Sequence, residues 1–405
     1  MLPIKEIKIE EYNYPLSDEK IAKYPLKQRD QSKLLHFNNG DIEERKFLQL
    51  PEFLPKDSLL LFNETKVIQA RLKFQKESGA KIEIFCLEPM EPTNDFQLAF
   101  QLSSPVVWKC MIGNAKRWKL GKLSSVFSFN GKDICLKAEI KQRLSDSWLV
   151  TFEWDDDSIK FHEIIEQNGL TPLPPYLNRE AEEADKDRYQ TIYANFNGSV
   201  AAPTAGLHFT EDILKKIKDL GIETAKLTLH VGAGTFKPVS VEKIADHEMH
   251  TERVIVSKET LLKIKTNLDK NIIPVGTTSM RTLESLFWMA LKLYDGDQGF
   301  QVEQWDPYTL DIPNDFDSNN AIDLLLKHLD TNSHENISGE TRLMIAPGYK
   351  FKFASGLITN FHQPKSTLLL LVSALIGEKW NEVYDFALKN NFRFLSYGDS
   401  CLLLP

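Results

Sequence analysis

The sequence predicts an α/β fold, with a large layered α/β body and a small β-barrel domain inserted into it. From residue 159 onward, apolar strands alternate with amphipathic helices, as in layered α/β proteins. Residues 63–154 instead show short strands separated by turns, a pattern that favours a small barrel or sandwich. The charge changes as well, because this segment has 14 basic and 10 acidic residues whereas the whole chain has a net charge of −8.

The length of 405 residues favours two domains over one. We assign residues 1–62 and 155–405 to a discontinuous catalytic body and residues 63–154 to the barrel. Residues 294–340 are acidic and lack a strong period, so we expect a surface insertion within the body. The net charge of −8 argues against nucleic-acid binding through overall charge, but it leaves room for a local basic surface.

The four cysteines contain no C-x-x-C pair, which predicts neither a zinc site nor a disulfide framework and indicates a reducing compartment. The N-terminal residues form no apolar segment. An apolar run such as Leu368 to Val372 is too short to cross a bilayer. We therefore expect a cytoplasmic protein that has no membrane partner and no metal.

The predicted barrel strands are short and apolar. Asn130-Gly131 marks a hairpin between two of them, because both residues tolerate the positive φ of a tight turn. The strands are expected at 67–74, 80–87, 96–102, 126–129, 134–140 and 148–152.

Three helices of the body have clear start signals. Thr210 is a predicted N-cap for a helix that ends at Gly221. A strand at 272–275 leads through a Gly-Thr-Thr-Ser turn into the second helix. A strand at 357–359 leads through Asn360 and His362 to the third helix, which Ser366 caps.

Two segments rich in small residues are candidate binding loops. Residues 198–210 let backbone approach a ligand and end near His208, although a packing turn explains the pattern better by itself. Residues 228–235 contain His230, Gly232, Gly234 and Thr235 after a strand. This loop lacks the third glycine of a dinucleotide fingerprint, but it suits close contact with an adenosine-sized ligand.

A cluster of polar side chains at 247–252 contains His250 and Glu252. The HExxH zinc spacing is absent, which argues against a metal site. An imidazole oriented by a carboxylate suits general acid–base catalysis, and a solvated polar turn is the alternative.

Two further motifs suggest binding of anions. Thr277, Thr278 and Ser279 begin a helix with Arg281 in its first turn, which suits a carboxylate or phosphate; an ordinary capped helix is the alternative. Cations and an aromatic ring are mixed in the barrel at Lys116, Arg117, Trp118 and Lys119. That mixture is typical of single-stranded nucleic-acid surfaces, and a solvated strand face is the alternative.

Seven segments together resemble the S-adenosylmethionine:tRNA ribosyltransferase-isomerase family of queuosine biosynthesis. They are DRYQTIY (187–193), GSVAAPTAGLHFT (198–210), TLHVGAGTFKPV (228–239), HEMHTE (247–252), VGTTSMRTLES (275–285), PGYKF (347–351) and ITNFHQPKSTLLLLVSA (358–374). Shorter blocks near residues 24–30, 62–65, 172–176 and 394–399 also match, so the resemblance spans nearly the whole chain in one order.

The resemblance implies transfer and isomerisation of the ribosyl moiety of S-adenosylmethionine onto the 7-aminomethyl-7-deazaguanine base at the tRNA anticodon wobble position. The products are epoxyqueuosine-tRNA, adenine and methionine. The implied partners are tRNA and S-adenosylmethionine, which is a substrate, and no other cofactor is implied. The implied fold is a barrel inserted into an α/β body.

With this chemistry in view, we hypothesise a role for each candidate residue. The hypothesised catalytic residues are His208, His230, His250 and Glu252. S-adenosylmethionine contacts are expected from Gly232, Gly234, Thr235, Thr277, Thr278, Ser279, Arg281, Asn360 and His362, and RNA contacts from Lys116, Arg117, Trp118 and Lys119.

Three alternatives remain at this point. A divergent paralogue would modify another acceptor, since Lys66 and Gln69 differ from the usual family residues. A non-catalytic RNA-binding module would use only the basic barrel. A methyltransferase is disfavoured, because no N-terminal strand leads into a complete glycine-rich loop with an acidic ribose ligand.

Overall fold

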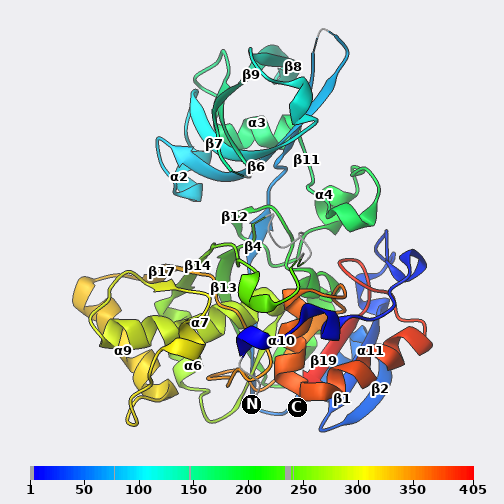
Figure 1. The fold of residues 1–405 in the computed structure, drawn as a ribbon, viewed down its shortest axis with the longest axis vertical. Coiled ribbons are helices and arrows are strands. Elements are labelled where there is room, and N and C mark those ends of the chain that lie inside the picture. Colours follow the sequence, from blue (N-terminus) through cyan, green and yellow to red (C-terminus); the bar gives the residue numbers. More distant parts are fainter. Residues whose placement is uncertain (1–3, 77, 146, 233–238, 240) are drawn as a thin grey trace.

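The structure, a computed structural model, describes residues 4–76, 78–145, 147–232, 239 and 241–405. Figure 1 shows a large α/β body that carries both termini and a smaller curled sheet at the opposite end of the long axis. Two parallel strands lie between these parts, β4 (Thr65–Val67) and β12 (Phe196–Ser199). The predicted α/β fold class is confirmed.

The body is built on a ten-stranded sheet. Its order is β16 (Gln301–Val302), β17 (Asn336–Thr341), β14 (Glu252–Ser257), β13 (Glu223–His230), β3 (Ser58–Asn63), β15 (Asn271–Val275), β18 (Leu357–Asn360), β19 (Ser400–Leu404), β1 (Lys33–Asn38) and β2 (Asp41–Lys46). The central strands β13, β3, β15 and β18 are parallel, so their carboxyl ends meet at one edge. Ligands of open α/β sheets bind at this edge.

Both faces of the large sheet are covered, as a parallel sheet requires. Strand β3 is buried along its whole length, and its side chains alternate between two cores: Leu59 and Leu61 in one, Leu60 and Phe62 in the other. The first core is closed by α6 (Lys258–Lys265), α7 (Thr277–Tyr294), α9 (Ser318–Asn332), α10 (Thr367–Ile376) and α11 (Trp380–Lys389). The second is closed by α1 (Leu50–Phe53) and α5 (Glu211–Asp219).

The predicted helix starts are confirmed. The Thr210 hydroxyl caps α5 by accepting from the Ile213 N–H at 3.4 Å, and Ser366 caps α10 in the same way. Helix α7 begins directly after Gly276, which has a φ of +91° that only glycine adopts readily.

The second sheet is antiparallel and curled. Its order is β11 (Gly169–Leu170), β5 (Arg71–Gln75), β6 (Lys81–Glu91), β7 (Val106–Gly113), β10 (Trp148–Glu153), β9 (Lys132–Arg143) and β8 (Leu123–Phe129). Strands β5 and β8 lie next to each other without forming a ladder, which gives a half-barrel. The hairpin at Asn130-Gly131 is confirmed, and both residues have positive φ.

Three details of the curled sheet differ from the sequence prediction. Residues 96–100 form a helix, α2 (Phe96–Phe100), because Asp95 caps its start and Phe96, Ala99 and Phe100 share a buried face. The sequence prediction contained no strand at the position of β7. Helix α3 (Phe161–Asn168) packs into the core of the curled sheet, so this unit extends past the predicted boundary at 154.

The prediction that residues 294–340 form a surface insertion is wrong. Helix α9 buries Ile322, Leu325 and Leu329 in the main core, and β16 and β17 extend the large sheet. The sequence did not indicate this core role, because the segment is short of apolar residues and buries only a narrow stripe of α9.

Two one-turn helices complete the fold, α4 (Asp185–Arg188) and α8 (Asp306–Thr309). No helix in the described ranges has both the length and the apolar character needed to span a bilayer.

Leu325→Ala should therefore lower the free energy of unfolding by about 2 to 5 kcal/mol, because it leaves a cavity under a fully buried side chain. Denaturant unfolding would measure this. Lys327→Ala, at an exposed position of the same helix, is the matched control and should change stability little. Equal stability of the two variants would show that α9 is not a core element.

Candidate active site

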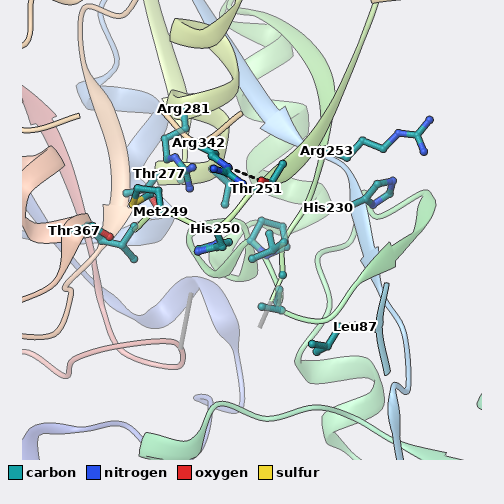
Figure 2. A pocket seen from close by; sticks show the side chains of 18 of the residues that line it. Leu87, His230, Met249, His250, Thr251, Arg253, Thr277, Arg281, Arg342 and Thr367 are labelled. Atoms are coloured by element: carbon teal, nitrogen blue, oxygen red, sulfur yellow. Dashed lines mark hydrogen bonds between the residues drawn. The ribbon is translucent and has the colours of Figure 1, made fainter. Parts of the chain in front are cut away.

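A large cavity lies at the carboxyl edge of the parallel strands. It holds about 940 Å³ and is lined by residues that directly follow β13, β15 and β18. Figure 2 shows His230, His250, Thr277 and Arg281 around this space. The curled sheet contributes residues 87–90 and Lys109, so both parts of the molecule form the walls. The volume is at the upper end of the range for ligand pockets and suits more than one nucleoside-sized group.

Three charged or titratable side chains form a chain beside this cavity. His250 Nε2 lies 3.1 Å from Glu252 Oε1, and Arg281 Nη1 lies 2.5 Å from Glu252 Oε2. Glu252 and Arg281 are buried, whereas the His250 side chain is partly exposed and lines the cavity. A neutral His250 that donates from Nε2 to this carboxylate carries no proton on Nδ1.

The Arg281 guanidinium fixes the charge state of its partner. Burial alone would raise the pKa of Glu252, but Arg281 and His250 hold this pKa below its ordinary value. Arg281 Nε donates to the carbonyl oxygen of Leu343 at 3.2 Å. Its Nη2 is buried and has no hydrogen-bond partner among the described residues. Arg281 therefore retains one donor for a ligand in the cavity.

His230 is held against a glycine. Its Nδ1 lies 3.1 Å from the Thr65 hydroxyl, and a Cβ on Gly198 would lie 2.6 Å from the imidazole. Only glycine fits at position 198, where φ is +150°. Burial lowers the pKa of His230 to about 4, so the ring is neutral at physiological pH. The contact with the His230 ring explains why the 198–210 segment begins with a glycine.

Asn360 and His362 both line the cavity after β18. The Asn360 amide is oriented on both sides: Oδ1 accepts from the Thr204 hydroxyl at 2.7 Å, and Nδ2 donates to His208 Nε2 at 3.1 Å. His208 Nδ1 in turn lies 2.8 Å from the Ser32 hydroxyl. His362 Nε2 contacts the Thr359 hydroxyl, and burial lowers the pKa of His362 to about 3.

The structure brings most predicted residues to the cavity and places three behind its wall. The lining includes His230, Gly232, His250, Thr277, Thr278, Arg281, Asn360 and His362. His208 contacts Asn360, Glu252 contacts Arg281, and the Ser279 hydroxyl donates to the Val275 carbonyl within the helix turn. Gly234 and Thr235 lie outside the described residues. His208 thus does not reach the cavity and contacts Asn360, which does.

Two arginines of the lining were missed in the sequence, Arg253 and Arg342. Arg253 was missed because no strand was expected at 252–257. Glu252 and Arg253 lie on opposite faces of β14, and Arg253 lines the cavity. Arg342 was missed because it directly follows β17, which we had placed in a surface insertion. Arg342 Nε donates to the Thr251 hydroxyl at 2.7 Å (Figure 2).

The prediction that Trp118 contacts RNA is wrong. Trp118 is buried in the core of the curled sheet, and its Nε1–H donates to the Gly121 carbonyl, because an indole needs both apolar cover and one acceptor. It cannot stack on a base. Lys116, Arg117 and Lys119 are exposed. They follow the end of β7 that pairs with Glu83, which is the end farther from the cavity.

Across the part of the chain that the structure describes, no three His, Cys, Asp or Glu side chains gather as metal ligands would. Among the histidines that line the cavity, His230 and His362 contact hydroxyl groups and His250 contacts a carboxylate.

Comparison with known proteins places the chain in a family. The sequence model of the family described as "Queuosine biosynthesis protein" matches residues 9–403. This chain belongs to that family. The S-adenosylmethionine:tRNA ribosyltransferase-isomerase of Trichlorobacter lovleyi is 39% identical over 402 residues, which cover 98% of this chain and 99% of the relative. That of Halothermothrix orenii is 40% identical over 404 residues and is covered completely.

These matches confirm the family resemblance seen in the sequence. A crystal structure of S-adenosylmethionine tRNA ribosyltransferase from Thermotoga maritima aligns with 97% of this chain and 100% of its own chain, at 27% identity and a TM-score of 0.46.

The neutral state of His208 has a consequence for stability. Burial lowers its pKa to about 3, whereas a histidine in an unfolded chain has a pKa of about 6.5. As the pH falls between these values, the unfolded chain binds a proton that the folded chain does not, so stability decreases. His208→Gln should therefore lose stability less steeply between pH 6.5 and 4.5, as measured by denaturant unfolding.

The control for this measurement is His334→Gln, at an exposed position, which should keep the wild-type slope. A His208→Gln variant with the wild-type slope would mean that His208 is protonated in the folded protein over this range, contrary to its burial.

Proposed function

We propose that the protein transfers and isomerises the ribosyl moiety of S-adenosylmethionine onto the 7-aminomethyl-7-deazaguanine base at the tRNA anticodon wobble position. The products are epoxyqueuosine-tRNA, adenine and methionine. The observation that carries the proposal is the convergence of separate sequence motifs on one cavity. It agrees with the name shared by relatives that match this chain over its full length.

S-adenosylmethionine would lie along the carboxyl edge of the parallel strands. Its methionine carboxylate suits Arg281 Nη2 and the start of α7 at Thr277 and Thr278, where a donor and the positive helix end favour an anion. The adenosine part would lie near Gly232, where backbone comes close to the cavity. The amides and hydroxyls around Asn360 and His362 would orient it.

The reaction needs a base, because the hydrogens on the ribose 5′ carbon next to a sulfonium are acidic and their removal starts the elimination that releases adenine. His250 is the best-placed candidate. It lines the cavity, and Glu252 orients its imidazole through Nε2. His230 is the second candidate, although its low pKa makes it a weaker base.

S-adenosylmethionine is a substrate in this proposal, and no other cofactor and no metal take part. The tRNA would enter between the body and the curled sheet, where Arg253, Arg342 and Lys109 line the cavity. Lys116, Arg117 and Lys119 would contact the RNA farther along the curled sheet. A cytoplasmic location is part of the same proposal, because the enzyme must meet tRNA there.

A single-turnover assay with precursor tRNA and adenine-labelled S-adenosylmethionine tests this function. His250→Gln should lower the rate of adenine release by about 10² to 10⁴, with nearly unchanged affinity for S-adenosylmethionine, because a base acts on the chemical step. Arg281→Lys, which keeps a cation beside Glu252 but removes Nη2, should instead weaken that affinity. His334→Gln lies outside the site and should react as the wild type does.

The assay also separates the alternatives. Formation of S-adenosylhomocysteine without adenine would identify a methyltransferase. Tight RNA binding with no reaction of S-adenosylmethionine would identify a binding module. Adenine release with a different RNA only would identify a divergent paralogue. A His250→Gln rate near wild type would move the base to His230.

A further inference from the structure

A second, small cavity lies behind the wall of the large one. Three arginines line it, Arg29, Arg188 and Arg393, together with His208. Ser396 lines both cavities, so the two are neighbours. The small cavity holds about 20 Å³. A single water molecule needs about 10 to 15 Å³ of such space, so the cavity admits one oxygen atom and no larger group.

Two of the three guanidinium groups are held only by carbonyl oxygens. Arg29 Nη1 donates to Gln190 O at 3.1 Å. Arg188 donates from Nη1 to Lys27 O at 3.0 Å and from Nη2 to Leu26 O. Arg188 Nε is buried and has no hydrogen-bond partner in the described part of the chain. These bonds fix the direction of both groups without neutralising them.

The carboxylates near the cavity are engaged with other groups. Asp399 pairs with Arg393 at 3.1 Å, Asp185 pairs with Arg179 at 2.7 Å, and Asp30 accepts from the Thr210 hydroxyl. Within the described ranges, neither Arg29 nor Arg188 has a carboxylate at ion-pair distance. Burial lowers the pKa of Arg29, and the nearby Arg188 lowers it further. Two like charges held this close favour an anion between them.

We propose that the small cavity binds one anionic phosphate oxygen, contributed by the backbone of the RNA substrate next to the nucleotide that enters the large cavity. Guanidinium groups in a fixed direction are suited to phosphate oxygens. Ser396 lines both cavities, so the small cavity lies next to the space that an inserted nucleotide would fill. This inference rests on the proposed function, because it takes the ligand to be the RNA substrate.

Free inorganic phosphate carries the same oxygen chemistry, so the experiment must separate the two sources. Arg29→Gln should weaken tRNA binding several-fold and reduce the slope of log affinity against log salt by about one, because it removes one phosphate contact. Arg29→Lys keeps the charge and should keep the slope. Arg45→Gln removes a partly exposed cation on β2, which pairs with Glu43, and is the matched control; it should bind tRNA as the wild type does.

Arginine modification of the wild-type protein by phenylglyoxal, mapped by mass spectrometry, tests the site without a variant. Substrate tRNA should protect Arg29 and Arg188 but not Arg45. Inorganic phosphate at the same phosphate concentration should protect neither. Protection by inorganic phosphate alone, or no protection together with an unchanged salt slope in Arg29→Gln, would overturn the proposal and leave a water-filled gap.

Adenine release by the same wild-type preparation keeps this result separate from the proposed function. If adenine is released but the Arg29 variants bind tRNA normally, the phosphate site is wrong and the function stands. If the variants lose RNA affinity but no adenine appears, the site stands and the reaction is different.

Discussion

The ion pair between Glu252 and Arg281 joins the antiparallel side of the large sheet to helix α7, and both charges are buried. Buried ion pairs add little net stability, since desolvation offsets much of the attraction, but they fix the relative position of the elements that carry them. Here the pair fixes β14 against α7 below the cavity. It also sets the carboxylate that orients His250.

Other polar side chains of α7 fix the positions of neighbouring segments through buried hydrogen bonds. The Ser285 hydroxyl lies 2.7 Å from the Thr341 hydroxyl at the end of β17. The Glu284 carboxylate accepts from the backbone N–H groups of Phe353 and Ala354 and from the Tyr349 hydroxyl. Burial raises the pKa of Glu284, and these donors oppose that rise. The helix is buried on nearly every side, so each polar group needs such a partner.

Four histidines in or next to the cavity wall divide into two kinds by their surroundings. Burial lowers the pKa of His208, His230 and His362 to about 3, 4 and 3, so these rings act as neutral hydrogen-bonding groups. His250 differs because it is partly exposed and contacts a carboxylate. These surroundings support the proposal that His250, rather than one of the buried histidines, moves the proton.

The sequence by itself determined the α/β class, the helix caps at Thr210 and Ser366, the hairpin at Asn130-Gly131 and the family, because these depend on local patterns. It also marked several residues of the cavity lining, such as His230, Thr277 and Asn360, since they lie at or just after the ends of strands. Only the tertiary structure decided the rest. A strand pattern cannot show that Trp118 turns into a core, that α9 has a buried stripe, or that His208 lies behind Asn360. Those outcomes depend on contacts between residues far apart in the chain, and no local period records them.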